Sequence, residues 1–352
     1  EHLRYRKPEA IAAYTRCLTR APHATDCLAG RLRLYGLQGD CASMERDARE
    51  WTVADPDEAA AFGALAVALH ARERPWPAVM SALEAKWART PDAKDRWFDE
   101  FAVASARGDF ATAQQIARAE LARVPPDARM YDQFFPAFEL VLAASEAGDR
   151  QTVAEVSRSF LDKAAAWSPE TVHEAAMPLV MVSAARSLGV LDREAGRVER
   201  QRWLAPVVEA QERAGGTDPY SKSVAWVVGY AINATDEESA REALDAMPRY
   251  APIPPPGLRG TDVDLVISSI YLLLGRPEDA RPYSETVARS CLRLENPYAW
   301  VFGQQQHGKV LAALGEEEAA RALYQRVIDA WQGAKPASHR VDAVRAALEA
   351  LR

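Results

Sequence analysis

Apolar residues recur at helical spacing along most of the chain, and polar residues fill the positions between them. One early segment carries Leu28, Leu32 and Tyr35 and then ends in Gly39-Asp40. This spacing places the apolar side chains on one face of a helix. Alternation of apolar and polar residues with a period of two is missing over any useful length, and the hairpin signal Asn-Gly does not occur. The pattern therefore predicts an all-α protein.

Prolines and Gly-acid pairs divide this helical pattern into units. Four prolines follow one another at intervals of 34, 35 and 34 residues: Pro22, Pro56, Pro91 and Pro125. A glycine can end one helix in a left-handed conformation, and an acidic residue after it can cap the next helix. Such pairs occur four times, as Gly39-Asp40, Gly108-Asp109, Gly148-Asp149 and Gly315-Glu316. A period near 34 residues predicts helical hairpins stacked into a solenoid.

The units resemble tetratricopeptide repeats (TPR), in which each repeat is a pair of antiparallel helices. The residues that carry the resemblance include Gly308, Leu311 and Gly315 in one helix and turn, followed by Ala320 and Tyr324 in the next helix. Small residues at such positions allow the two helices of a pair to approach closely. The resemblance implies an α-solenoid of antiparallel helix pairs, a TPR-like superhelix, closed by a C-terminal capping helix.

The regularity of the period suggests a division along the chain. We expect regular TPR-like repeats in residues 1–126, longer and irregular helical hairpins in 127–249, a proline-rich loop or joint in 250–260, repeats again in 261–336, and the capping helix in 337–352. The pairing of the helices within 127–249 stays open. We expect a helix over about 219–234 and, in the last repeats, helices over 277–294 and 298–314. Because the chain opens at Glu1 within a helical repeat, it is expected to be a piece of a longer protein.

Charge and cysteine content exclude several classes of function. The chain has 43 basic and 50 acidic residues, interleaved throughout, for a net charge of −7. Nucleic-acid binding needs a clustered basic surface, so a nucleic-acid partner is not expected. No apolar run approaches the roughly 20 residues that a membrane span requires. The four cysteines, Cys17, Cys27, Cys41 and Cys291, lack zinc-ligand spacing, so we expect packed free thiols, a reducing compartment and hence a cytoplasmic location.

One segment matches a nucleotide-binding motif by spacing alone. Residues 303–309, from Gly303 to Gly308-Lys309, fit the G-x4-G-K pattern of a P-loop, but Val310 stands where that loop needs a hydroxyl for magnesium. The repeat already accounts for Gly308, so we expect a helix here. The histidines are scattered, and we predict no catalytic, cofactor-binding or metal-binding residues.

The resemblance implies a binding groove lined by the first helix of each pair, with a protein or peptide as the partner. The residues expected to face this groove are Arg33, Leu37, Val67, His70, Phe98, Ala102, Gln305 and Lys309. The clamp that some TPR proteins use to hold a peptide's terminal carboxylate is not visible. The oligomeric state stays open.

The last repeats are also similar to the C-terminal TPR regions of large bacterial serine/threonine protein kinases, on residues that include Trp300, Tyr324, Trp331 and Pro336. This similarity implies a non-catalytic interaction array within a bacterial signalling protein, because the kinase motifs themselves are absent from the sequence. Two alternatives are the sensor arm of a bacterial ATPase-type transcription regulator, which would bind a small effector or a partner, and a P-loop enzyme at Lys309.

Overall fold

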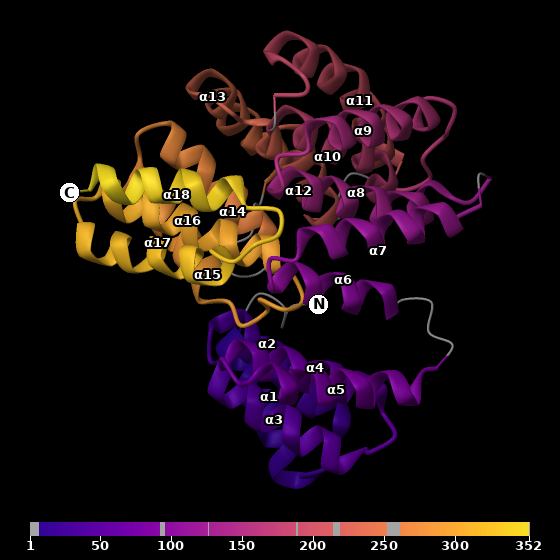
Figure 1. The fold of residues 1–352 in the computed structure, drawn as a ribbon, viewed down its shortest axis with the longest axis vertical. Coiled ribbons are helices and arrows are strands. Elements are labelled where there is room, and N and C mark those ends of the chain that lie inside the picture. Colours follow the sequence, from indigo (N-terminus) through magenta and orange to yellow (C-terminus); the bar gives the residue numbers. More distant parts are fainter. Residues whose placement is uncertain are drawn as a thin grey trace. The chain divides into compact units, whose positions relative to one another are not determined.

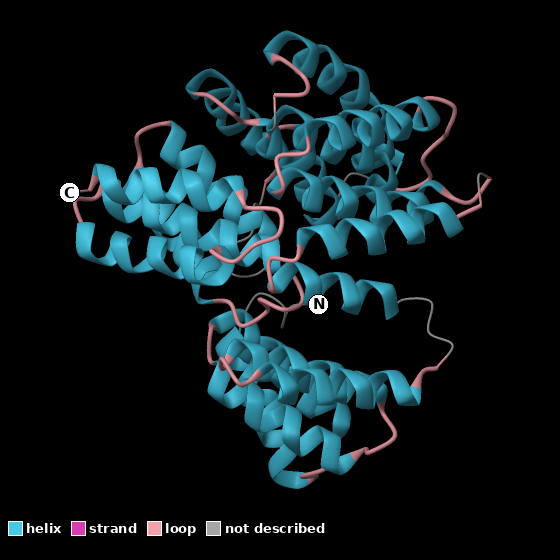
Figure 2. Ribbon diagram, viewed as in Figure 1, coloured by secondary structure: helices cyan, strands magenta, loops and turns pink. Residues whose placement is uncertain are grey.

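A computed structural model describes residues 7–91, 96–125, 127–187, 189–213, 219–251 and 261–351. Within these ranges every regular element is helical, with eighteen α-helices and two short 3-10 segments (Figure 2). The prediction of an all-α fold built from consecutive helix pairs is confirmed. No helix in these ranges is long and apolar enough to cross a membrane.

The chain forms two compact units, each assembled from segments that are distant in sequence. The first unit contains residues 1–106, 254–265 and 282–307. Its helices are α1 (Lys7–Arg20), α2 (Thr25–Gln38), α3 (Cys41–Ala54), α4 (Ala59–Ala71), α5 (Trp76–Arg89) and α6 (Arg96–Ala106) (Figure 1). It also holds the beginning of α14 (Thr261–Leu273), the end of α15 (Pro277–Arg289) and the larger part of α16 (Pro297–Ala313).

Helices α1 to α5 of the first unit each pack against the next helix in the chain. A buried ion pair joins α2 to α3: Asp47 is wholly buried, and the Nε and Nη2 atoms of Arg31 lie 2.7 and 2.9 Å from its two carboxylate oxygens. This two-pronged geometry is the strongest form of the Arg–carboxylate pair. Leu32 and Met44 pack together beside it in an apolar cluster. The α2–α3 pair is therefore held by both apolar and charged contacts.

The Gly-Asp pairs act as the sequence predicts. Gly39 adopts a φ of 81° after α2, and the Asp40 carboxylate accepts a hydrogen bond of 3.0 Å from the Ser43 N–H at the start of α3. Asp109 and Asp149 cap the helices that follow them in the same way. At Gly315-Glu316 the glycine is again left-handed, but the Glu316 side chain makes no capping bond. The longer side chain of glutamate is a poorer N-cap.

The second unit contains residues 107–253, 266–281 and 308–352. Its helices are α7 (Phe110–Arg123), α8 (Met130–Glu146), α9 (Arg150–Ala164), α10 (Val172–Ser187), α11 (Arg193–Arg213), α12 (Pro219–Gly229), α13 (Glu237–Ala246), α17 (Glu317–Trp331) and α18 (His339–Ala350). The 3-10 segments η2 (Ala231–Asn233) and η3 (Met247–Tyr250) flank α13, and the remaining parts of α14, α15 and α16 complete this unit.

Neighbouring helices of the second unit pack in chain order from α7 to α11, and α10 also contacts α8 and α12. The last helix, α18, packs on α17 and buries Val341 and Val344. Its N-terminal end is anchored to α8 through Glu146, which is wholly buried. Two guanidinium nitrogens of Arg340 lie 2.9 and 2.8 Å from the Glu146 carboxylate, and the Ser338 hydroxyl donates a further bond of 3.1 Å.

Two predicted helix boundaries in the last two-fifths of the chain are wrong. Helix α12 ends at Gly229 and is followed by the 3-10 turn η2, where a continuous helix to residue 234 was expected. Helix α15 ends at Arg289, five residues short of the expected end at Leu294. The proline-rich loop expected at 250–260 lies almost wholly outside the described residues, and the expected boundaries at 126, 249 and 260 stay predictions.

Candidate functional site

The residues that α15 was expected to include form instead a non-helical segment, residues 290–296, which we call the crossing segment. It connects α15 to α16 and lies within the first unit. A disulfide joins Cys291 of this segment to Cys41 at the start of α3, across 250 residues of sequence. The Cys291 N–H also donates a hydrogen bond of 3.0 Å to the carbonyl oxygen of Gly36, in the last turn of α2.

The hydrogen bonds of the crossing segment explain why it is not helical. The Cys291 N–H is bonded to α2, and the Leu292 N–H bonds to the Ser290 hydroxyl at 3.2 Å. A turn follows, closed by a bond of 3.0 Å from the Asn296 N–H to the Leu292 carbonyl. The Asn296 side chain then accepts a bond of 3.0 Å from the Ala299 N–H, which caps α16. At Cys291 and Leu292, tertiary and side-chain partners thus take the place of the i to i−4 bonds that would continue α15.

Apolar side chains of the crossing segment enter the core of the first unit. Cys291 is wholly buried in a cluster that includes Leu32, Met44, Ala48 and Ala68, and Leu292 packs against it. Leu294 is 4% exposed and belongs to a second cluster with Leu69, Val79 and Val103. The approach to α2 is close, because a Cβ added at Gly36 would lie 3.2 Å from Leu292 Cδ2.

Arg293 of the crossing segment binds the C-terminal end of α4. Its Nε donates a bond of 2.8 Å to the His70 carbonyl oxygen, its Nη2 bonds to the same oxygen, and its Nη1 lies 3.3 Å from Glu73 Oε1. The last carbonyls of a helix lack partners within the helix and carry partial negative charge, so a guanidinium is well suited to this position. The side chain of Arg293 is only 13% exposed.

Two unusual features mark this end of α4. Glu73 has a φ of 55°, in the left-handed region that favours glycine, and it is the sole residue other than glycine with positive φ in the described ranges. Burial, and secondly the positive charge of Arg293, lowers the pKa of His70 to about 3. His70 is therefore neutral at physiological pH, and its ring lies 4.8 Å from the ring of Trp76.

The contact continues to α6 beyond the crossing segment. The Tyr298 hydroxyl, in the first turn of α16, lies 3.0 Å from Ser105 Oγ, and its ring centroid lies 6.1 Å from that of Phe101. Residues 291 to 298 thus meet the C-terminal halves of α2, α4 and α6 in that order. We call this surface the α2–α4–α6 edge and define it by Gly36, His70 and Ser105.

The structure disperses the predicted groove residues. Val67 packs against both apolar clusters, the His70 carbonyl binds Arg293, and Ala102 is 6% exposed. Val67 and His70 thus contact the crossing segment or the clusters that it enters, and Ala102 is buried. The remaining residues of the first unit keep partial or full exposure: Arg33, Leu37, Phe98 and Gln305. Lys309 is exposed and belongs to the second unit.

The expectation of free thiols is wrong. Cys17 is bonded to Cys27, which links α1 to α2, and Cys41 is bonded to Cys291, so no cysteine is free. The Cα–Cα distances are 6.4 and 5.5 Å. The Cys41–Cys291 pair has no local spacing signal, because its two residues lie 250 positions apart in the sequence.

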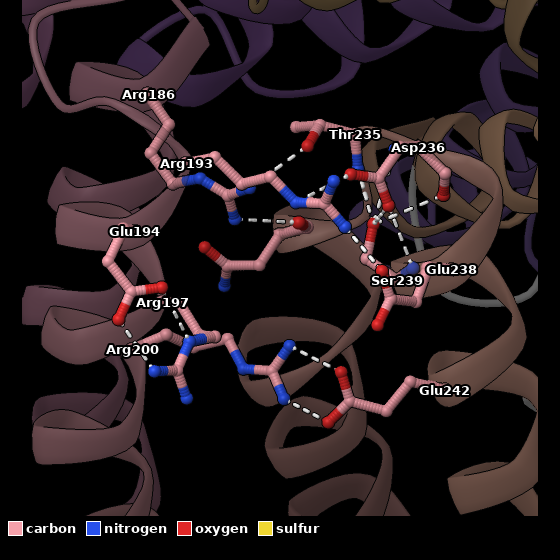
Figure 3. Close-up of polar contacts among 11 residues, drawn as sticks. Arg186, Arg193, Glu194, Arg197, Arg200, Thr235, Asp236, Glu238, Ser239 and Glu242 are labelled. Atoms are coloured by element: carbon pink, nitrogen blue, oxygen red, sulfur yellow. Dashed lines mark hydrogen bonds and ion pairs between the residues drawn. The ribbon is translucent and has the colours of Figure 1, made fainter.

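A second group of polar residues in the second unit lies among α10, α11 and α13 (Figure 3). Arg186 donates a bond of 2.9 Å to the Asn233 carbonyl, Arg193 pairs with Glu238, and both terminal nitrogens of Arg200 pair with Glu242. Burial, and secondly the positive charge of Arg200, lowers the pKa of Arg186. Each guanidinium binds a carboxylate or a carbonyl of the chain, so this group holds α13 against α11 and the segment before α13 against α10.

Two features of the described residues bear on possible chemistry, a cavity in the second unit and the segment that matches a P-loop. A cavity of about 280 Å³ lies among α7, α8 and α9, and its rim carries Lys163, whose Nζ lies 3.1 Å from Gln133 Oε1. No cluster of histidine, cysteine, aspartate and glutamate able to hold a metal ion occurs in these ranges. The segment from Gly303 to Lys309 lies inside α16, as expected, so its backbone N–H groups point along a helix and not into a phosphate loop.

Comparison with known proteins finds no matching family, and the solved structures that match are of low similarity. No family model matches the chain, and no curated protein matches it. Among solved structures, it is similar to the structure of Naa15/Naa10 bound to HypK-THB, with 13% identity and a TM-score of 0.28 over 91% of this chain. The match covers 60% of that longer chain. It is also similar to the TPR domain of P58(IPK), with 13% identity and a TM-score of 0.26, covering 93% of this chain and 97% of that one. Similarity at this level establishes no relationship, and the fold assignment rests on the helices themselves.

Proposed function

We propose that this chain is a non-catalytic scaffold that binds other proteins through the first helices of its repeats. The supporting observation is the crossing segment: a non-helical stretch of polypeptide lies across α2, α4 and α6 and is held there by main-chain, guanidinium and apolar contacts. Main-chain hydrogen bonds, charged side chains and apolar pockets are the kinds of contact that peptide-recognition surfaces use. A surface that holds one such segment has the right chemistry for another.

The groove residues that keep exposure extend this surface. Arg33 and Leu37 lie on α2, and Phe98 lies on α6, on helices that the crossing segment touches. We propose these three, together with Gln305, as contacts for a partner on the first unit. Lys309 stays a separate prediction in the second unit. The exposed residues of the predicted set are thus suited to contact a protein or peptide partner in a concave groove.

The two disulfides support an oxidising compartment in place of the cytoplasm that the sequence suggested. Disulfides persist in secreted, periplasmic or lumenal proteins and are rare where glutathione keeps thiols reduced. An origin in a bacterial kinase or an ATPase-type regulator rests on sequence resemblance alone. The disulfides weigh against both contexts, because both need cytosolic ATP.

Site-specific photo-crosslinking tests the proposed function. A crosslinking residue is placed at Arg33 or Phe98. The control position is Glu50, which is exposed and lies on α3, the second helix of its repeat. We expect defined protein adducts from Arg33 and Phe98 and none from Glu50, with the adducts identified by mass spectrometry. Equal labelling from all three positions, or no adduct from the first two, would contradict the proposal.

A further inference from the structure

The α2–α4–α6 edge presents two carbonyl oxygens that accept hydrogen bonds from the crossing segment. Gly36 and His70 lie in the last turns of α2 and α4, and their carbonyl oxygens accept turn bonds of 3.4 and 3.0 Å from the Gly39 and Glu73 N–H groups. The crossing segment adds a second donor to each oxygen, a backbone N–H at Gly36 and a guanidinium at His70. Any extended peptide carries the first kind of donor, and only arginine carries the second in this forked form.

The order of residues in the crossing segment defines what this edge recognises. Cys291 and Leu292 enter the cluster beside α2, Arg293 binds the end of α4, and Leu294 enters the cluster beneath α4. The sequence is apolar, apolar, arginine, apolar. Negative charge favours the arginine from two sources, the C-terminal end of α4 and the Glu73 carboxylate.

We propose that the α2–α4–α6 edge is a binding site for a linear segment of a partner protein with this apolar–apolar–Arg–apolar pattern, and that the crossing segment is its tethered occupant. This inference rests on the proposed scaffold function and names the chemistry of the partner. The crossing segment is attached at both ends and by the Cys41–Cys291 bond, so its effective concentration at the edge is on the order of millimolar or higher. A partner gains access when that bond opens.

Opening the bond requires a protein dithiol as reductant. Cys41 is partly exposed and Cys291 is wholly buried, so the thiolate of the dithiol attacks Sγ of Cys41 and Cys291 leaves as a thiolate that takes up a proton. The second thiol of the reductant then displaces Cys41. Two electrons and two protons pass to the two cysteines, and the reductant leaves as a disulfide.

Peptide binding to an opened variant tests the proposal. The full chain carrying C41A/C291A/R293A lacks the clasp and the arginine of the crossing segment. The probe is a fluorescent peptide of residues 289–298, Arg-Ser-Ala-Leu-Arg-Leu-Glu-Asn-Pro-Tyr, with alanine in place of Cys291. We expect fluorescence anisotropy to show at least tenfold tighter binding to this variant than to C17A/C27A, which loses the other disulfide and keeps the clasp. A peptide in which the central arginine is alanine should bind at least tenfold more weakly.

A second measurement covers the case in which the opened variant does not fold. The single variant C291A keeps Cys41 as a thiol, and a peptide of residues 289–298 that retains its cysteine can form a mixed disulfide with it. We expect at least tenfold more adduct in a glutathione buffer than with a scrambled peptide of the same composition. Equal yields would overturn the proposal and show that the crossing segment is core packing alone.

Two other results would also overturn it. One is a folded opened variant that binds neither peptide or binds both equally. The other is a concentration-dependent dimer that excludes the peptide, which would make a second copy the occupant. Crosslinking at Arg33 and Phe98 in the wild-type chain does not depend on opening the clasp, so failure of this inference and failure of the scaffold function are separate observations.

Discussion

The two disulfides should differ greatly in their contribution to stability, although both lie in the first unit. The perturbation is the removal of each bond by paired alanine substitution, C41A/C291A and C17A/C27A. Alanine avoids burying a new hydroxyl at Cys291, which is wholly buried. The two closed loops do not overlap in sequence, so the two losses can be compared directly and should add in the quadruple variant.

The expected magnitude follows from the lengths of the loops. The Cys41–Cys291 bond closes a loop with a sequence separation of 250, whereas the Cys17–Cys27 separation is 10. In the chain-entropy account the longer loop gives about 5.5 kcal/mol of stabilisation of the folded state and the shorter about 2.7 kcal/mol. The difference of roughly 3 kcal/mol depends only on the ratio of the loop lengths, so it is the firmer quantity. The loss of the long loop should also release the crossing segment.

Urea unfolding followed by circular dichroism measures both free energies of unfolding, and hydrogen exchange reports on the two units separately. We expect C41A/C291A to lose more stability than C17A/C27A, and we expect faster exchange at the Cys291 N–H position of the variant and across the ends of α2 and α4. If C17A/C27A loses as much as C41A/C291A or more, the loop-length reasoning is refuted. If the stability is lost but exchange at the crossing segment is unchanged, the clasp role of the bond is refuted.

Four further predictions each concern a single site. The free energy of unfolding of the wild-type chain should fall by about 1.4 kcal/mol per pH unit as the pH drops below 6.5, because the pKa of His70 is about 3 in the folded state and the unfolded chain takes up the proton first. H70Q should flatten this slope between pH 6.5 and 4.5 in urea titrations. An unchanged slope would contradict the assignment. R293A should lower the free energy of unfolding by about 2 kcal/mol, as measured by urea midpoints. R293K should recover only part of this loss, because lysine lacks the forked donors of a guanidinium. E146Q should lower the free energy of unfolding by about 3 kcal/mol, because it leaves the Arg340 guanidinium without its buried charge partner. An equal loss in R340M would show that the ion pair stabilises the fold. Mg-ATP should not raise the thermal midpoint of the wild-type chain or of K309A, and a rise that K309A abolishes would restore the P-loop hypothesis.

The parts of the fold that the sequence predicts are those that short stretches of chain determine. The turn at Gly39-Asp40 depends on a left-handed glycine and on a carboxylate three residues before the Ser43 N–H that it caps, and both are visible in the sequence. The helix that runs through Gly303 was predictable because the repeat explained its small residues better than a phosphate loop did. Periodicity and caps together predict the all-α fold and its packing as consecutive helix pairs.

The parts that the sequence does not predict are decided by contacts between distant residues. Residues 290–294 have no proline or glycine to end a helix, so the local pattern continues α15 to Leu294. The helix ends earlier because the Cys291 N–H bonds to α2 and its sulfur bonds to Cys41. An even number of cysteines was the one available signal for disulfides, but it cannot identify the pairing.

The same contacts connect the predicted groove with the crossing segment. The last carbonyls of a helix can accept hydrogen bonds from outside it and carry partial negative charge. At α2 and α4 the Gly36 and His70 carbonyls accept such bonds from residues 291 and 293, in addition to the turn bonds from Gly39 and Glu73. A partner that displaces the crossing segment must therefore supply a guanidinium, or the negative end of α4 and the Glu73 carboxylate lose their cation. This requirement makes arginine the residue whose removal from a peptide should reduce binding most, and it separates specific binding at this edge from general apolar contact.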